Sequence, residues 1–337
     1  MSYLVKRQHF VPRTFLDKFS EQRGNEYFIE AKNTKAQSPN FNTNIKNVCV
    51  KRHLYTINFA NATKDEQMLL ENFYNTQFEA GYNEIYQLLI DPDVVQITQE
   101  QKEKIISTVI SMYSRVAKWL NESKEQQRQI LNNLLSIAKK FDYPTIELPN
   151  GEVMEIGDKS IADILDELEP GRKLNYIQTQ IEQLNYLFSI RKNDNLSINV
   201  THNHHEFLTS DVPIVLNNGE QVLIDRITND CHIMLNISPS HCLTIMPPYD
   251  GSSLQIVRNQ MPDASSFLYT AINNDHQFRN SENFVLGSKS GIKFFEDNEE
   301  IVKTREAVDT IIQMAEGELK GIVEMYDKFY YRHKTDL

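Results

Sequence analysis

The spacing of apolar residues changes along the chain and separates helical from extended stretches. Between residues 64 and 191, apolar positions recur at helical spacing, whereas from Leu196 they form short runs separated by polar turns. Residues 1–60 are mixed. Short strands are expected there at Glu26–Ala31 and Leu54–Phe59, and a long polar loop is expected at Lys32–Asn47.

The helical stretch predicts several helices. The first, Asp65–Leu89, is apolar on more than one side, so we expect it to be buried on several faces. Thr98 and Gln101 form a capping-box pair that begins a second helix, with an apolar face running from Ile105 to Leu120. We expect a third helix at Glu122–Phe141 and a β-hairpin at Asp142–Asp158. A further helix is expected at Ser160–Arg191, with a break near Pro170 and Gly171.

The later stretch predicts an antiparallel β-block. Its strands are expected at Leu196–Val200, Phe207–Leu208, Ile214–Leu216, Val222–Ile224, His232–Ile237, Cys242–Met246 and Phe284–Gly287. Helices are expected from Pro262 to about His276 and over Glu300–His333. Because strands and helices occupy separate stretches, the sequence predicts an α+β fold: a helical block packed against a mostly antiparallel sheet, with a long C-terminal helix.

The pattern divides the 337 residues into four segments, which we expect to form one compact unit. Residues 1–60 form an N-terminal strand and loop segment that joins the β-block, and residues 61–192 form the helical block. Residues 193–297 form the antiparallel β-block, and residues 298–337 form the C-terminal helix.

Composition narrows the class of protein. The net charge of -11 shows no broad basic surface for nucleic acid, although a local basic groove or a metal ion could still serve a nuclease. Cys49, Cys231 and Cys242 form no CxxC pair and indicate reduced thiols. The N-terminus lacks the apolar stretch of a signal peptide, and no run approaches the ~18 residues of a membrane span. We therefore expect a cytoplasmic protein with no membrane partner.

Common catalytic motifs are absent from the sequence. It contains no P-loop, GxGxxG, HExxH or GxSxG. Their absence disfavours Walker-type nucleotide hydrolysis, Rossmann oxidoreduction, zincin proteolysis and α/β-hydrolase chemistry.

The segment Gln8–Pro12 is the most unusual motif of the chain. Pro12 suits the first turn of a helix, so Gln8 and His9 are expected just before that turn, where free N–H groups favour anions. His9 could bind a metal or move a proton. The alternative is that Gln8 and His9 tether the segment to the core by hydrogen bonds.

A second motif places Ser210 and Asp211 where Pro213 stops a predicted strand. A carboxylate at a strand end is a candidate functional group, and the alternative is an Asx-type turn that caps backbone N–H groups. Along the first helix, Glu71 and Glu79 fall on one strip.

Arg115 lies at the edge of its helix's apolar face. If buried, it would need a carboxylate, for which Glu79 and Asp211 are candidates, in a catalytic site or in a structural salt bridge.

Together and in this order, these motifs resemble the DUF4238 family. The matching residues are Gln8–Phe19, Glu71, Glu79, Arg115, Thr209–Pro213, Leu235–Pro247 and Ala271–Asn273. The chain departs from the family pattern at Val212, where Asn is common, and after Arg115, where the usual Thr-Pro is missing. The resemblance implies homology and no particular reaction. A histidine cluster outside these motifs offers weaker metal candidates in His202 and His204.

Two functions remain open on these residues, beside a purely structural assembly through the C-terminal helix. One is a metal-dependent phosphodiester hydrolase, a nuclease-like effector of a bacterial defence or mobile-element system acting on nucleic acid or a nucleotide. Its catalytic residues would be His9, Arg115, Asp211 and Glu79, with Glu79 and Asp211 as ligands to Mg²⁺ or Mn²⁺, and with Gln8, Glu71 and Ser210 in binding. The other is a non-enzymatic recognition module that binds a protein or a small anionic ligand in a cleft between the helical and β-blocks.

Overall fold

The computed structural model describes residues 7–56, 63–147, 151, 153–156, 159–202, 204–217, 226–248 and 251–299. Within these ranges the fold is α+β, with helices and largely antiparallel sheets in separate stretches of the chain. The predicted helix Glu300–His333 and the predicted strand Val222–Ile224 lie outside the described residues.

A five-stranded sheet forms the centre of the larger β-region, in the order β10-β11-β12-β8-β13. Its strands are β8 Asn195–Val200, β10 Ile214–Asn217, β11 His232–Ser238, β12 His241–Met246 and β13 Ile256–Gln260. Four of them were predicted from the sequence. The edge strand β13 was not, and it pairs with β8 in parallel while the other pairs are antiparallel.

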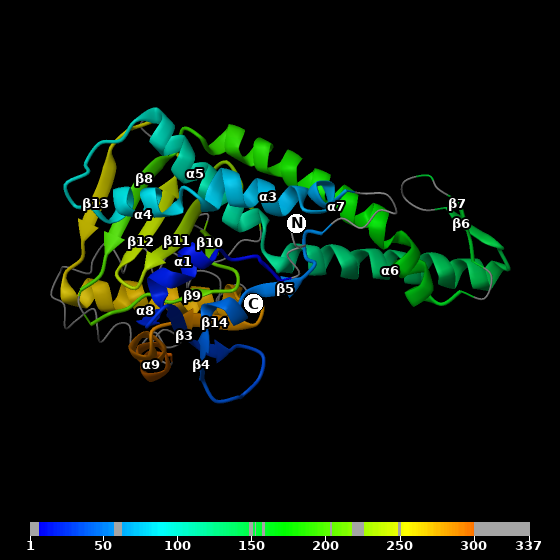
Figure 1. The fold of residues 1–337 in the computed structure, drawn as a ribbon, viewed down its shortest axis with the longest axis horizontal. Helices are drawn as coiled ribbons and strands as arrows, with labels where there is room; N and C mark the ends of the chain where they lie inside the picture. The colour runs from blue at the N-terminus through cyan, green and yellow to red at the C-terminus, as the bar shows by residue number, and fades with distance from the viewer. Residues whose placement is uncertain are drawn as a thin grey trace, which may run out of the picture.

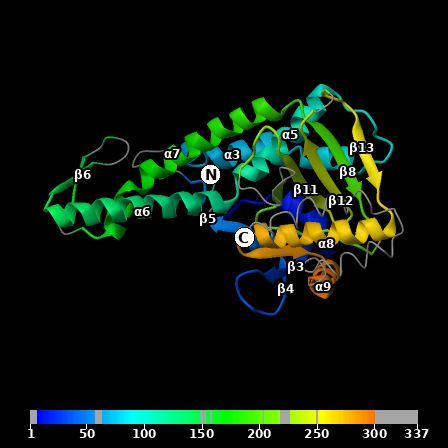
Figure 2. The ribbon, with the colours of Figure 1, turned by 180° about the vertical axis from the view of Figure 1, so that it is seen from behind.

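The two faces of this sheet differ in polarity because side chains alternate along each strand. On one face, Ile198, Leu235 and Leu243 belong to the main hydrophobic core, which also contains residues of the helices. On the other face, Ser197 and Thr244 occupy paired positions and look toward α8 (Asp263–Asn280), which is seen alongside the strands in Figure 2.

A second sheet joins the N-terminal segment to the later part of the chain. It contains β2 Glu21–Arg23, β3 Glu26–Asn33, β4 Phe41–Asn44, β9 Thr209–Ser210 and β14 Phe284–Gly287. Strand β3 pairs with β14, which pairs with β9. Strand β4 lies inside the stretch predicted as a loop, and β9 begins just after the predicted Phe207–Leu208. The unpredicted helix α9 (Lys289–Asn298) packs on β3 and β14.

A separate two-stranded pair holds the N-terminal motif. Strand β1 (Arg7–His9) pairs antiparallel with β5 (Val50–Arg52). Of the predicted strand Leu54–Phe59, residues 54–56 are not in a strand, and residues 57–59 lie outside the described residues. The helix α1 (Arg13–Leu16) and the 3₁₀ turn Asp17–Phe19 follow. Gln8 and His9 therefore lie in a strand, and the helical segment after Pro12 is short.

The first predicted helix is divided. It consists of α2 Lys64–Gln67, α3 Leu69–Tyr74, the π-helical turn Asn75–Glu79 and α4 Tyr82–Ile90. Helix α5 (Gln99–Ser114) begins at the predicted capping box. The next helix break was placed wrongly: it falls at Arg115 and Val116 rather than near Glu122. Val116 adopts an extended conformation with φ -63° and ψ 144° before α6 begins.

Helices α6 (Ala117–Phe141) and α7 (Ile161–Arg191) form an arm that projects to one side in Figure 1. The hairpin of β6 (Thr145–Glu147) and β7 (Val153–Glu155) lies at its tip, as predicted, over a small core of its own. Helix α7 runs without the break predicted near Pro170. None of the described helices is long and apolar enough to cross a membrane.

Candidate functional site

Arg115, at the junction of α5 and α6, is the centre of the candidate site. Only 1% of its side chain is exposed. Its Nη2 donates to the backbone carbonyl of His9 at 2.6 Å and pairs with Oε1 of Glu79 at 2.7 Å. The guanidinium also lies over the ring of Tyr74, 4.7 Å from its centre. Strand β1, the π-helical turn and the α5–α6 junction therefore meet at one cation.

Backbone pairing and Gln8 hold the N-terminal strand in this position. Gln8 is fully buried, its Oε1 accepts a 2.7 Å hydrogen bond from the backbone N–H of Tyr55, and its Nε2 contacts Sδ of Met68. The hydroxyl of Tyr55 in turn donates to the carbonyl of Arg115. Gln8 thus has the tethering contacts that one of the two sequence interpretations gave it.

The π-helical turn positions Glu79. Such turns interrupt regular α-helix and occur frequently at functional sites. Glu79, the last residue of this turn, is 20% exposed, so it stands on the outer side of the buried Arg115. Glu71 lies in α3 and is buried. The predicted strip containing Glu71 and Glu79 therefore faces an internal charged group.

Several buried polar atoms around Arg115 make no hydrogen bond to any described residue. They are Nε and Nη1 of Arg115, Nε2 of His9, Oε2 of Glu71 and the hydroxyl of Tyr74. Arg115 interacts electrostatically with His9, Glu71 and Tyr74, so these groups lie near one another. Most buried polar groups in proteins are hydrogen-bonded, and a concentration of exceptions points to a place for bound water or a ligand.

Burial changes the protonation of two of these groups in opposite directions. Desolvation raises the pKa of Glu71 to about 7, with Glu79 adding to the effect and Arg115 opposing it. Desolvation also lowers the pKa of His9 to about 4.

His9 is neutral at pH 7, because its pKa of about 4 lies far below that pH, and the backbone of Ile45 only partly opposes the desolvation. The buried Nε2 of His9 has no hydrogen-bond partner among the described residues.

Asp211 and Ser210 do not join this cluster. The carboxylate of Asp211 accepts from the backbone N–H groups of Glu282 and Asn283, both at 2.8 Å, and from the Asn283 side chain at 3.1 Å. The hydroxyl of Ser210 bonds to Val212 and Gln277. These contacts fit a structural turn, because the hydrogen-bonding capacity of both side chains is used inside the fold.

The histidine segment lies apart from Arg115. His202 is half exposed and its Nδ1 stands 3.4 Å from a carboxylate oxygen of Asp263, while His204 is exposed. In the part of the chain that the structure describes, no three His, Cys, Asp or Glu side chains come together to hold a metal ion. Glu79 and Asp211 in particular are engaged by different partners.

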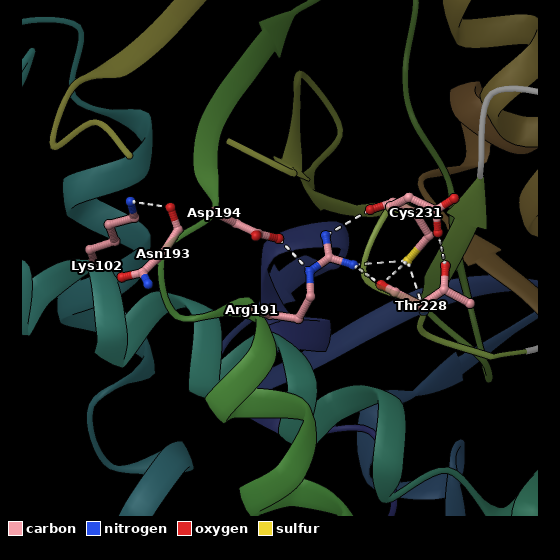
Figure 3. Close-up of polar contacts among 7 residues, drawn as sticks. Lys102, Arg191, Asn193, Asp194, Thr228 and Cys231 are labelled. Atoms are coloured by element: carbon pink, nitrogen blue, oxygen red, sulfur yellow. Dashed lines mark hydrogen bonds and ion pairs between the residues drawn. The ribbon is translucent and has the colours of Figure 1, made fainter. Parts of the chain in front are cut away.

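A second buried arginine makes a useful contrast (Figure 3). Arg191, at the end of α7, donates through Nε to Asp194, through Nη1 to Sγ of Cys231 and the carbonyl of Thr228, and through Nη2 to the carbonyl of Cys231. Nearby, Lys102 of α5 donates to the carbonyl of Asn193. All three nitrogens of the Arg191 guanidinium have partners, so these contacts hold the end of α7 against the segments that lead into the strands.

The comparisons with known proteins give a family. Residues 7–291 match the model of DUF4238, described as a protein of unknown function. The chain belongs to this family. No curated protein and no solved structure matches it.

Sequence reasoning missed Tyr55 and Tyr74 as members of the site. Tyr74 lies three residues after Glu71, which places both on one helix face, and that spacing was the available signal. Tyr55 carried no such signal, because its place depends on the pairing of β1 with β5.

Proposed function

We propose that the protein binds a small oxyanion at Arg115 and transfers protons on it, as a phosphodiester hydrolase of the nuclease-like kind expected from the sequence. The observation that carries this proposal is the buried guanidinium with two N–H-bearing nitrogens that no described residue accepts from, surrounded by unpaired atoms of His9 and Glu71. Fixed donors in a desolvated site stabilise negative charge more strongly than water-exposed donors do.

The roles follow from protonation. Arg115 holds a phosphoryl oxygen and Nε2 of His9 accepts a hydrogen bond from the attacking water. Glu71, with a pKa of about 7, is the group best matched to proton transfer at neutral pH. Its carboxylate takes the proton of the water as the new P–O bond forms, and the carboxylic acid returns it to the leaving oxygen as the old P–O bond breaks. Asp211 has no part in this scheme.

The test is cleavage of labelled single-stranded DNA, RNA and a chromogenic phosphodiester, each with EDTA, Mg²⁺ or Mn²⁺. We expect turnover in the wild type and a loss of about 10²-fold or more in Glu71→Gln and Arg115→Lys. Glu84→Gln, at an exposed residue paired with Lys104, is the matched control and should retain full activity. Turnover that survives in both site variants, or none with any substrate, contradicts the proposal.

The second candidate is the recognition module. Large apolar side chains on the arm favour a protein partner: Ile130, Ile137 and Phe141 of α6 are 44%, 52% and 58% exposed. Anion binding that depends on Arg115 without cleavage, together with a partner lost on Ile137→Glu, would select this alternative.

A further inference from the structure

A pocket of about 360 Å³ lies between the five-stranded sheet and α8. We call it the sheet–helix pocket. Its lining on the sheet side includes Ser197 and Asn199 of β8 and Asn259 of β13, and on the helix side Tyr269 and Asn273. It shares no lining residue with the Arg115 cluster, so it is a separate site.

Strand register explains why these polar side chains gather. Thr244 pairs with Ser197, and Asn199 pairs with Asn259, so they stand on one face of adjacent strands. A sheet face that a helix covers is normally apolar, because buried amides are costly without partners. On this face the amides have partners, and the polar groups surround a cavity instead of packing directly against the helix.

Hydrogen bonds fix the orientation of the amides. Nδ2 of Asn259 donates to Oδ1 of Asn199 at 3.0 Å, and Nδ2 of Asn199 donates to the hydroxyl of Tyr269 at 2.9 Å. On the helix side, Oδ1 of Asn273 accepts from Asn236 at 2.7 Å. Nδ2 of Asn259 also donates to Oγ of Ser197, and Nδ2 of Asn273 donates to Sγ of Cys242. These bonds fix the amides in the pocket wall and leave Oδ1 of Asn259 and the second N–H of Asn199 available to a ligand.

The lining is uncharged. No Asp, Glu, Lys or Arg occurs among the described residues that line the pocket. Its two histidines are neutral at pH 7, because desolvation lowers the pKa of His232 and lowers that of His276 to about 3. A phosphate or carboxylate group would therefore meet no compensating charge there.

The remaining lining favours a flat ring. Met234 and Met246 contribute thioether side chains, which make favourable contacts with aromatic rings. Ile272 and Val257 add apolar surface. The volume lies at the small end of the ~300–1,000 Å³ range of ligand pockets, which suits one ring system.

We infer that the sheet–helix pocket binds an uncharged nucleobase or nucleoside. An asparagine amide, with one donor and one acceptor side by side, matches the edge of a purine such as adenine. Oδ1 of Asn259 and the remaining N–H of Asn199 supply such an acceptor and donor, and the methionines flank the ring. The inference rests on different residues from the proposal for Arg115, and either can fail without the other.

Calorimetric titration of the full chain with adenine, adenosine, guanosine, cytidine, uridine and AMP tests the inference. At least one base or nucleoside should bind with a Kd below about 1 mM. AMP should bind at least tenfold more weakly than adenosine, which corresponds to a difference in binding free energy of about 1.4 kcal/mol. Arg115→Lys should bind the same nucleosides as the wild type.

Two variants locate the binding. Val257→Trp fills the pocket from a residue that is 54% exposed and should abolish binding, whereas Val153→Trp, at a 68% exposed position on the arm, should not. Asn259→Asp keeps the side-chain size at an exposed position and adds a negative charge. Asn259→Asp should weaken nucleoside binding, because it removes the Nδ2 that orients Asn199 and places a negative charge at the pocket. This variant replaces Val257→Trp in the test if Val257→Trp lowers the Tm. Absence of binding by every base and nucleoside, full affinity in Val257→Trp and Asn259→Asp, or tighter binding of AMP each overturns the inference.

Discussion

Replacing Glu71 with Gln should change the pH dependence of stability in a direction that the site's geometry fixes. Burial raises the pKa of Glu71 from 4.5 to about 7. Below pH 4.5 the carboxyl is protonated in both the folded and the unfolded chain and contributes no difference. Between pH 4.5 and 7 the unfolded chain releases its proton while the folded chain keeps it, so the free energy of unfolding falls as pH rises.

The size of the effect follows from the two pKa values. A tenfold difference in proton affinity corresponds to 1.36 kcal/mol, so the rise from 4.5 to about 7 amounts to about 3 kcal/mol at pH 8. Glu71 is 7% exposed, and solvent screening therefore removes little of this amount. Glutamine has nearly the same shape and no charge to desolvate, so Glu71→Gln should be about 3 kcal/mol more stable relative to the wild type at pH 8 than at pH 4.5.

Urea denaturation at pH 4.5, 6 and 8 measures this difference. Glu84→Gln, an exposed carboxylate, is the control and should show less than about 0.5 kcal/mol of change over the same range. A wild type and a Glu71→Gln variant with parallel stability curves from pH 4.5 to 8 would refute the reasoning. That result would mean that Glu71 reaches water or is compensated by Arg115 in the folded protein.

Three further substitutions test the structural contacts. Asp211→Asn should lower the free energy of unfolding by about 1–3 kcal/mol, because it weakens the acceptor for two backbone N–H groups, and it should leave activity per folded molecule unchanged. Asp194→Asn should cost about 3–5 kcal/mol by leaving Arg191 buried without its carboxylate, as measured by denaturation. Gly287→Ala should cost about 1–3 kcal/mol, since its Cβ would lie 2.4 Å from a side-chain carbon of the buried Leu208; a Tm equal to the wild type would contradict this packing.

The sequence predicted those elements whose signals are local. The capping box at Thr98 and Gln101 and the period-two runs of β8, β11 and β12 depend on neighbouring residues, and the structure has them. Strand β13 was missed because it is a parallel edge strand whose exposed positions show no apolar alternation. Strand β4 was missed for a similar reason, since its residues Phe41–Asn44 are mostly polar and become a strand by pairing with β3.

The residues of the candidate site also differ in whether the sequence could predict their contacts. Arg115 and Glu79 were proposed as partners because a buried arginine needs a carboxylate, and the two side chains are in contact. The alternative partner, Asp211, was excluded only by tertiary structure, since nothing in the sequence shows that the backbone of Glu282 and Asn283 satisfies its carboxylate. The sheet–helix pocket had no sequence signal, because its asparagines come from separate strands and a helix.

Arg115 and Arg191 differ in a way that bears on function. Both guanidinium groups are buried and paired with an acid, so burial and charge do not distinguish them. They differ in what remains of their hydrogen-bonding capacity. Every nitrogen of Arg191 has a partner, and its cluster needs nothing more to be stable.

At Arg115, two nitrogens make no hydrogen bond within the described residues, and neither do Nε2 of His9 and Oε2 of Glu71, two nearby groups that interact electrostatically with Arg115. A purely structural network would be expected to pair these donors with these acceptors, because each unpaired buried group costs about 1–3 kcal/mol. A bound molecule with its own acceptors and donors would supply the hydrogen bonds that these unpaired groups lack. Arg115 is therefore the arginine at which ligand binding should be sought first.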